Sequence, residues 1–558
     1  MTMPSIIRQI YVISDLHVGG RYPDGVNAKS DSWPDRNDRG FRICTHVAEL
    51  AGFVDSLAQK SATAGPAVEL VINADFVDFL AEERNGPERW KALIDDEDQA
   101  AARMDEIIDR DRVFFDALAN LLARGHRLIV LLGNHDVELS FPRVRRRLET
   151  ALGVDSGTRF EFLYDGQAYV VGDAIIEHGN RYDAFNVIDH DGLRRVRSSQ
   201  SRREELHDDH RFRQPAGSKL VAGVMNHLKA RFPFIDLLKP EDGAAVPILL
   251  ALAPAAYSVL SRLDLGKDAA RLAVEARRRD LLPGSQSSFA GDISATSTGH
   301  TGRPTDLGHG DMGYDDMGFS PAEHAEFQPH HSDDGLRTLL AEQLGTEGAD
   351  AFARQILDAV PEQERLADQP LTTGLEVDIS GDISARSLAG AITAGVGAAV
   401  DMGGRVAAVG KLLLARQSMP LSQRIDALYV AIRAVQDDRS FDRSTETKAP
   451  YREAAQKLVR RGFRVVVFGH THLAKRVELS GGLYLNSGTW ADLMRFPRDI
   501  LDKPIAQART ALRRFVETLE KRQFAEYVEF IPTYVRLDLG GDDRVIAAEL
   551  CDYRPAEG

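Results

Sequence analysis

The sequence predicts an α/β protein whose strands are covered on both faces. Five short apolar runs rich in β-branched residues are typical of strands buried on both sides, and each run ends in Asp, Asn or His. Helix-like stretches at 42–59, 100–124 and 450–461 lie between several of the runs. Strands that alternate with helices indicate an α/β sheet, and ligand sites in such sheets form beyond the carboxyl ends of the strands.

Polar residues suited to catalysis or metal binding follow each of the five strand-like runs. The runs cover residues 10–14, 70–73, 128–132, 174–177 and 463–468. The polar residues that follow them are, in chain order, Asp15 and His17, then Asp75 and Asp78, then Asn134, His135 and Asp136, then His178, and finally His470 and His472. Because the runs end in this way one after another, we expect these residues to converge on one crevice.

Seven of these residues form a mixed nitrogen and oxygen ligand set. They are Asp15, His17, Asp75, Asn134, His178, His470 and His472. Imidazole with carboxylate suits Mn, Fe, Zn or Co, of which we favour Mn, whereas Ca prefers sites made of oxygen alone. Seven ligands are too many for one tetrahedral ion, so they indicate two ions that share a bridging carboxylate. Two metals about 3.5–4 Å apart can activate hydroxide and clamp a phosphoryl oxygen.

Each short pattern taken alone also has an ordinary structural explanation. A single histidine after a strand is more often a hydrogen-bonded structural residue than a metal ligand, and Asp-x-His arises by chance in a long chain. Gly-Asn-His-Asp at 133–136 and Gly-His-Thr-His at 469–472 are much rarer. The occurrence of all five patterns, each directly after a predicted strand, favours a metal site.

In this order the patterns resemble those of the calcineurin-like metallophosphoesterases. That family carries Asp-x-His, Gly-Asp-x-x-Asp, Gly-Asn-His-Asp/Glu, a later His and Gly-His-x-His, and all five blocks are present here with Ala74 in place of one Gly. The resemblance covers the two ends of the chain and nothing in the middle. It implies a four-layer αββα sandwich, in which helices cover two mixed sheets.

The resemblance also implies a role for each position. The implied ligands are Asp15, His17 and His472 for the first metal, Asn134, His178 and His470 for the second, and Asp75 as the bridge between the two. His135 would contact the phosphate and protonate the leaving oxygen. Asp78 or Asp136 would orient that imidazole, as the residues behind a catalytic group commonly do.

Local strings are distantly similar to UDP-2,3-diacylglucosamine hydrolases. The similar strings are 14–19, 178–183 and 469–472. His135 and Asn180 differ from the Arg and Asp that those hydrolases usually carry. Purple acid phosphatases have a Tyr ligand three positions after the bridging Asp, where this chain has Asp78, so that branch is disfavoured.

The spacing of the patterns divides the chain into a split core and an insertion. The core would comprise residues 1–189 and 450–558, and residues 190–449 would form a large, mainly helical insertion between ligand-bearing strands. Since both ends of the insertion start near the predicted site, we expect a lid or substrate-selecting domain. Residues 284–335, rich in Gly, Ser, Asp and His, are typical of a mobile loop.

Two apolar stretches of the insertion leave three interpretations open. Residues 244–260 and 388–415 are apolar but are interrupted by prolines or charges. Neither is a regular span of about 20 apolar residues. They indicate helices packed into the core of a lid, or a surface for an acyl chain or for peripheral membrane contact, or, least favoured, a transmembrane span.

Arginines near the predicted site are candidates for substrate binding. Arg143 and Arg146 follow the Gly-Asn-His-Asp loop, and Arg181 follows His178. An Arg-rich segment, 190–219, fits either anion recognition or, as we prefer, a solvated linker.

Composition limits the partners and the compartment. The 558 residues carry a net charge of −15, which argues against duplex nucleic acid as a partner because DNA-binding proteins usually show a basic footprint. Two cysteines form no disulfide framework, and the N-terminus resembles no signal peptide, so we expect a cytoplasmic protein. The sequence predicts no particular oligomeric state.

The motifs lead to one main functional expectation and two alternatives. The main one is a dinuclear metal-dependent hydrolase that cleaves a phosphodiester or pyrophosphate bond in a small nucleotide- or lipid-linked substrate by attack of metal-activated hydroxide. One alternative is a phosphomonoesterase or protein phosphatase. The other, of a different class, is a metal-binding scaffold without catalytic activity.

Overall fold

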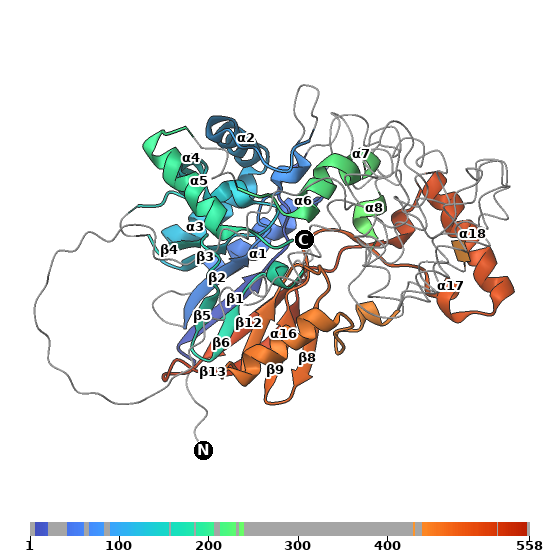
Figure 1. Ribbon diagram of the computed structural model, residues 1–558. Coiled ribbons are helices and arrows are strands. Elements are labelled where there is room, and N and C mark those ends of the chain that lie inside the picture. Colours follow the sequence, from blue (N-terminus) through green and yellow to red (C-terminus); the bar gives the residue numbers. More distant parts are fainter. Residues whose placement is uncertain are drawn as a thin grey trace, which may run out of the picture.

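The fold is seen in a computed structural model of the chain (Figure 1). The structure describes residues 6–20, 42–60, 66–82, 90–155, 158–183, 186–205, 212–229, 234–238, 428–429, 438–521 and 523–554. The two apolar stretches and the loop 284–335 expected within the insertion therefore lie outside the described residues.

The larger sheet of the described chain has six strands in the order β13-β12-β1-β2-β3-β4. Their bounds are β1 (Arg8–Ile13), β2 (Ala67–Asn73), β3 (Arg127–Leu131), β4 (Phe160–Leu163), β12 (Thr533–Leu539) and β13 (Val545–Asp552). β1 to β4 pair in parallel, and β12 and β13 extend the sheet antiparallel beside β1. The carboxyl ends of β1, β2 and β3 therefore share one edge.

A second sheet of five strands has the order β5-β6-β7-β9-β8 within the described residues. Its strands are β5 (Tyr169–Val171), β6 (Ala174–Ile176), β7 (Val465–Phe468), β8 (Lys475–Leu479) and β9 (Gly482–Asn486). β6, β7 and β9 pair in parallel. The pairing of β6 with β7 brings together strands that are almost 300 residues apart in the sequence.

Alternating side chains of the strands pack into different cores. In β1, Ile10 and Val12 join a core that also holds Ile176 of β6 and Val467 of β7, so this core lies between the two sheets. The intervening Tyr11 and Ile13 face another core on the helical side of the larger sheet. Each fully buried aliphatic side chain of this kind contributes about 1.5–3 kcal/mol of hydrophobic stabilisation.

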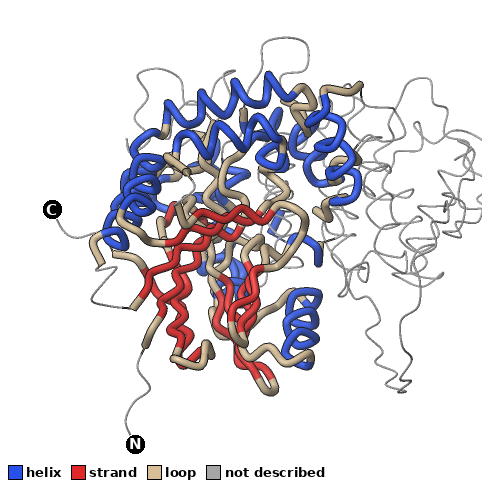
Figure 2. Tube along the Cα trace, turned by 90° about the vertical axis from the view of Figure 1, so that its left-hand side faces the viewer, coloured by secondary structure: helices blue, strands red, loops and turns tan. Residues whose placement is uncertain are grey.

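Helices cover the outer faces of the sheets, as Figure 2 shows. On the larger sheet these are α1 (Val47–Ala58), α2 (Glu97–Arg110), α3 (Arg112–Ala123) and α4 (Pro142–Ala151), and on the second sheet α16 (Ala449–Arg460). The class is therefore α/β, as predicted. The helix expected from residue 42 begins at Val47.

The single helical stretch expected at 100–124 is wrong, because it is two helices that meet at Asp111. The backbone of Asp111 leaves the helical region (φ −111°, ψ 28°). Its carboxylate is 2% exposed and pairs with the guanidinium of Arg42. The break between the two helices therefore coincides with a buried ion pair to a residue that is distant in the sequence.

The described beginning of the expected insertion contains several helices. It contains α5 (His190–Arg202), α6 (Ala216–Leu220), a π-helical turn η5 (Val221–Met225), α7 (Asn226–Lys229) and α8 (Phe234–Leu237). The solvated linker preferred for residues 190–219 is therefore wrong for 190–202, where Asp189 caps α5 through a bond from Gly192 N. Arg197 is 8% exposed and pairs with Asp165.

Further elements complete the C-terminal part. They are the strands β10 (Leu493–Met494) and β11 (Val528–Glu529) and the helices α17 (Arg498–Asp502) and α18 (Ile505–Glu520). In the described parts of the chain, no helix has the length and apolar character needed to cross a bilayer.

Candidate metal centre

Strained turns at the strand ends hold the predicted ligands. Asp15 (φ 53°), His17 (φ 48°), Asp75 (φ 45°), His470 (φ 69°) and His472 (φ 60°) all adopt left-handed backbone conformations. Such conformations cost of order 1–3 kcal/mol in residues other than glycine and persist only where the surrounding structure enforces them. Their concentration at these strand ends is typical of a functional site.

Two glycines allow the strand ends to approach one another. A Cβ on Gly133 would lie 2.0 Å from Oδ1 of Asp75, and a Cβ on Gly469 would lie 2.6 Å from Oδ2 of Asp15. Only glycine fits at these two positions. Ala74, in contrast, tolerates a φ of 70°, a conformation in which glycine would be less strained.

The structure brings six of the seven predicted ligands into overlapping groups that can hold a cation. The groups are Asp15, His17 and His472; His17, Asp75 and His135; and Asp75, His178 and His470. Within each group one donor atom of every residue lies within 4.8 Å of the others. Asp75 belongs to two of the groups, one with His17 and His135 and one with His178 and His470.

The first cluster is built on the turn after β1 and the loop after β7. Nε2 of His17 lies 3.1 Å from Nε2 of His472, and Nε2 of His472 lies 3.3 Å from Oδ1 of Asp15. Asp15 also accepts a hydrogen bond from the backbone amide of His470 at 2.9 Å. The other ring nitrogen of His17 faces Asp78 at 3.2 Å.

The second cluster joins Asp75 to residues of both sheets. Oδ2 of Asp75 lies 3.1 Å from Nε2 of His178 and 4.0 Å from Nε2 of His17. Nδ1 of His178 faces the carbonyl oxygen of Asn73 at 3.1 Å. A carbonyl only accepts, so Nδ1 carries a proton and Nε2 is the nitrogen that is directed at Asp75.

Asn134, the seventh predicted ligand, has an amide oxygen that suits a cation. The residue is 2% exposed. Among the described residues, its Oδ1 is buried and has no hydrogen-bond partner, a condition that costs free energy unless another group binds the oxygen. Nitrogen and oxygen donors of this kind fit divalent transition metals.

His135 is oriented by Asp78 and not by Asp136. Nδ1 of His135 lies 3.2 Å from Oδ1 of Asp78, whose other oxygen faces His17. Asp136 instead accepts hydrogen bonds from the backbone amides of Phe76 at 2.7 Å and Gly133 at 2.6 Å. Asp136 therefore fastens the loops after β2 and β3 to each other.

Charges within the clusters shift several pKa values. Burial alone would raise the pKa of Asp15, but the hydrogen bond and charge of His472 lower it to about 2. Burial would likewise raise the pKa values of Asp75 and Asp78, yet nearby histidines hold both below the ordinary range. The carboxylates are thus ionised and ready to bind cations.

Two histidines, His135 and His178, show the opposite pKa shift. Burial would lower the pKa of His135, but the charges of Asp78 and Asp75 raise it to about 9. The pKa of His178 is raised to about 9 as well, because Asp75 outweighs the effect of burial. Burial and the charge of Asp75 raise the pKa of Asp136 to about 7.

Two of the three arginine candidates, Arg143 and Arg181, pair with carboxylates outside the clusters. Arg143 and Arg146 line a cleft of about 460 Å³ between α2 and α4, whose lining includes none of the predicted metal ligands. The backbone amide of Arg143 donates to Glu97 at 2.7 Å. Arg181 pairs with Glu177 at 3.3 Å.

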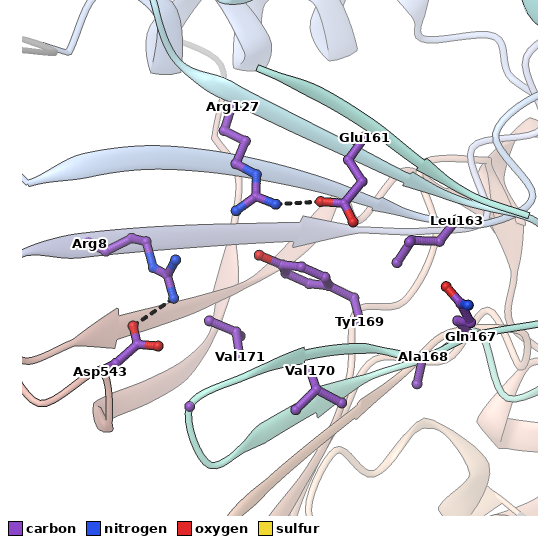
Figure 3. A pocket seen from close by; sticks show the side chains of 11 residues that line it. Arg8, Arg127, Glu161, Leu163, Gln167, Ala168, Tyr169, Val170, Val171 and Asp543 are labelled. Carbon is purple, nitrogen blue, oxygen red and sulfur yellow. Dashed lines mark hydrogen bonds and ion pairs between the residues drawn. The ribbon is translucent and has the colours of Figure 1, made fainter. Parts of the chain in front are cut away.

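Another cavity, of about 430 Å³, lies at the opposite end of the strands (Figure 3). Arg8 and Arg127, the first residues of β1 and β3, line it together with Tyr169. Both guanidinium groups are paired, Arg8 with Asp543 at 2.7 Å and Arg127 with Glu161. Because the ligands follow the other ends of β1 and β3, this cavity is separate from the metal centre.

Sequence reasoning gave no role to Asp183 and Asn186, which lie beside the second cluster. Oδ2 of Asp183 lies 3.1 Å from Nε2 of His470, and Nδ2 of Asn134 donates to Oδ1 of Asn186 at 3.4 Å. A carboxylate five residues beyond His178 was the available signal. The sequence alone does not show that this carboxylate lies near the site, because its position depends on the turn η3 (Asn180–Tyr182).

The start of the expected insertion also reaches the centre. Ser218 of α6 donates to the carbonyl oxygen of Asn134 at 3.2 Å, and Asn226 of α7 donates to that of Leu80 at 2.7 Å. Lys229 is buried, and its charge lowers the pKa of His135. This segment therefore packs over the loops that carry Asn134 and Asp78.

The arrangement offers three overlapping groups of donor atoms that could hold a cation, next to a histidine whose Nδ1 faces the buried carboxylate of Asp78. Comparisons with family models, with curated proteins and with solved structures give no match.

Proposed function

We propose that this protein is a dinuclear metal-dependent phosphoesterase of the calcineurin-like kind. The observation that carries the proposal is the position of Asp75, whose Oδ2 lies 4.0 Å from Nε2 of His17 in one ligand group and 3.1 Å from Nε2 of His178 in the other. One group follows β1 and β7, and the other includes residues that follow β6 and β7. A carboxylate shared by two mixed nitrogen and oxygen groups could hold two metals close together, as two-metal hydrolysis requires.

The ligands divide between two cations according to the clusters. Asp15, His17 and His472 would hold the first cation, and Asn134, His178 and His470 the second, with Asp75 common to both. When bound, two ions of Mn, or of Fe, Zn or Co, would supply Lewis acidity toward water and toward the phosphoryl oxygens. His178 presents Nε2 to its cation because the carbonyl of Asn73 holds Nδ1.

His135 would act as the proton donor to the leaving oxygen. Its Nδ1 proton is held by Asp78, so the exchangeable proton is on Nε2. The charge of Asp78 raises the pKa of this ring and so favours the protonated form that a general acid needs. Asp78 fixes the orientation of the ring and stabilises its charge, and Lys229 contributes a second positive charge nearby.

The packing of the layers supports the finer description of the fold. One core lies between the two sheets, and helices cover both outer faces, as a four-layer αββα sandwich requires. Residues 1–189 and 450–558 would be its two parts, and 190–449 an insertion whose first helices pack over the centre. We propose a lid or substrate-selecting role for that insertion, and a cytoplasmic location in keeping with the free thiols of Cys44 and Cys551.

The substrate that we favour is a small phosphodiester or pyrophosphate. A phosphomonoesterase would use the same cations and the same acid. Relative rates on bis(p-nitrophenyl) phosphate and p-nitrophenyl phosphate separate the two activities. We expect the diester to be hydrolysed faster.

The test is hydrolysis of the diester in the presence of Mn²⁺. His135→Ala should lower kcat about 10²–10⁴-fold, the usual contribution of a general acid, and Asp75→Asn should abolish turnover. Asp109→Asn, which removes a carboxylate that is 70% exposed and pairs with Arg112, should match the wild type. Equal rates for all four proteins would refute the proposal, and retention of metal without turnover would favour a binding scaffold.

A further inference from the structure

We propose that Asp183 and Asn186 form a positioning pair for the second cation. The pair presets two of its ligands, His470 and Asn134, which come from different sheets. This inference rests on the proposed function and assigns a role to two residues that do not themselves belong to the ligand set.

The first half of the pair fixes the tautomer of His470. Oδ2 of Asp183 lies 3.1 Å from Nε2 of His470. A carboxylate only accepts hydrogen bonds, so Nε2 of His470 is the protonated ring nitrogen. The lone pair is then on Nδ1, which becomes the nitrogen available to a cation.

The second half fixes the orientation of the Asn134 amide. Oδ1 of Asn186 accepts a hydrogen bond from Nδ2 of Asn134 at 3.4 Å. This contact orients the amide so that its oxygen points away from Asn186. Oδ1 of Asn134 is buried and has no hydrogen-bond partner among the described residues.

Hydrogen bonds between Asp183 and Asn186 join the two halves. Nδ2 of Asn186 donates to Oδ2 of Asp183 at 2.7 Å, and the backbone amide of Asn186 donates to the carbonyl of Asp183 at 2.9 Å. Nδ2 of the buried Asn180 donates to the carbonyl of Asn186 at 2.9 Å. These hydrogen bonds connect the two residues to each other and to Asn180, none of which belongs to the ligand set.

The two clusters consequently have separate supports. Asp78 stands behind His17 of the first cluster, and Asp183 stands behind His470 of the second. Residues behind metal ligands typically change metal affinity 10–100-fold when they are mutated. Loss of the Asp183 or Asn186 side chain should therefore weaken the binding of one cation and leave the binding of the other unchanged.

Calorimetric binding of Mn²⁺ to the metal-free full-length chain tests this inference. We expect two binding steps in the wild type. In Asp183→Asn and in Asn186→Leu one step should weaken by about 10–100-fold, while the other step changes less than about twofold. Asp191→Asn is the matched control, because that carboxylate is 74% exposed and pairs only locally with Arg194.

A double variant adds a readout that a general loss of structure would not give. If Asp183 and Asn186 act as one unit, combining Asp183→Asn with Asn186→Leu should weaken the affected step little further than either change alone. Thermal unfolding of the metal-free variants checks that they fold. Unchanged affinity in both single variants, or equal weakening of both steps, would overturn the inference.

The readout is independent of catalysis, so the two proposals can fail separately. A wild type that binds two Mn²⁺ ions but hydrolyses no phosphate ester refutes the phosphoesterase, and a selective loss of one ion in the variants still supports the positioning pair. An active enzyme whose variants keep both affinities refutes only the positioning pair. A wild type that binds no Mn²⁺ refutes both.

Discussion

Cation binding to the metal-free protein should release a proton from His178. The pKa of this ring is raised to about 9, chiefly because Asp75 outweighs burial, and a group with that pKa is about 97% protonated at pH 7.5. A cation needs the lone pair on Nε2, since Nδ1 faces the carbonyl of Asn73. Binding therefore displaces about one proton from this residue.

The same reasoning fixes the pH dependence of affinity. Between pH 6.5 and 8.5 the ring of His178 is protonated in the free protein, so each unit of pH should strengthen binding about tenfold for each displaced proton. Release should disappear above pH 10, where His178 is already neutral. Affinity should rise with pH because the pKa of His178 is raised. A lowered pKa would leave the ring neutral, and the cation would then bind without releasing a proton from it.

Calorimetry with saturating Mn²⁺ in buffers of different ionisation enthalpy measures the released protons. The wild type should release about one proton more than His178→Gln at pH 7.5. His190→Gln is the control, because burial and neighbouring arginines lower the pKa of His190 to about 4 and leave it neutral. Equal release by the wild type and His178→Gln, or affinity that is constant from pH 6.5 to 8.5, would refute the reasoning.

Three further predictions concern the loops and the proton donor. Gly133→Ala should abolish cation binding, because the added Cβ would lie 2.0 Å from Oδ1 of Asp75. The control Gly153→Ala, at a left-handed position with open space around it, should keep cation binding and cost about 1 kcal/mol of stability. Calorimetry measures the binding and thermal unfolding measures the stability of both variants. Asp78→Asn should lower kcat about 10–100-fold and move the basic limb of the pH–rate profile to lower pH, because Asp78 raises the pKa of His135. The melting temperature of the metal-free protein should fall as the pH rises from 6.5 to 9. Protonation of His135, whose pKa is raised to about 9, contributes on the order of 3 kcal/mol to the free energy of unfolding below pH 6.5. That contribution is lost as the pH rises through the raised pKa.

The strands could be predicted closely from the sequence because their signal is local. The apolar runs at 10–14, 70–73, 128–132 and 463–468 correspond to β1, β2, β3 and β7 with bounds that shift by at most three residues. A β-branched run buried on both faces has few other conformations that satisfy its backbone and bury its side chains. Once the strands are placed, the direction of the chain shows that the polar residues after each run lie at the carboxyl ends of the strands.

Features that depend on distant partners could not be predicted. At the break between the two helices, Asp111 pairs with Arg42, which is 69 residues away in the sequence, and helix periodicity on either side gives no sign of this contact. His135 pairs with Asp78 and not with Asp136, because the carboxylate of Asp136 already accepts hydrogen bonds from two loop amides.

The arginine candidates illustrate the same limit on the surface. Proximity in sequence to the Gly-Asn-His-Asp loop suggested that Arg143 would reach a substrate. The helix α4 instead directs it toward Glu97 and Asp98 of α2. Residues that follow a ligand in the sequence stay near it only within the same loop, because the next helix carries them away from the site.

Anomalous diffraction from crystals soaked in Mn²⁺ is the measurement that tests the central claim most directly. The account predicts two manganese peaks about 3.5–4 Å apart, one on either side of the Asp75 carboxylate, with His17 and His472 at one and His178 at the other. A single peak, or peaks that do not share Asp75, would contradict it.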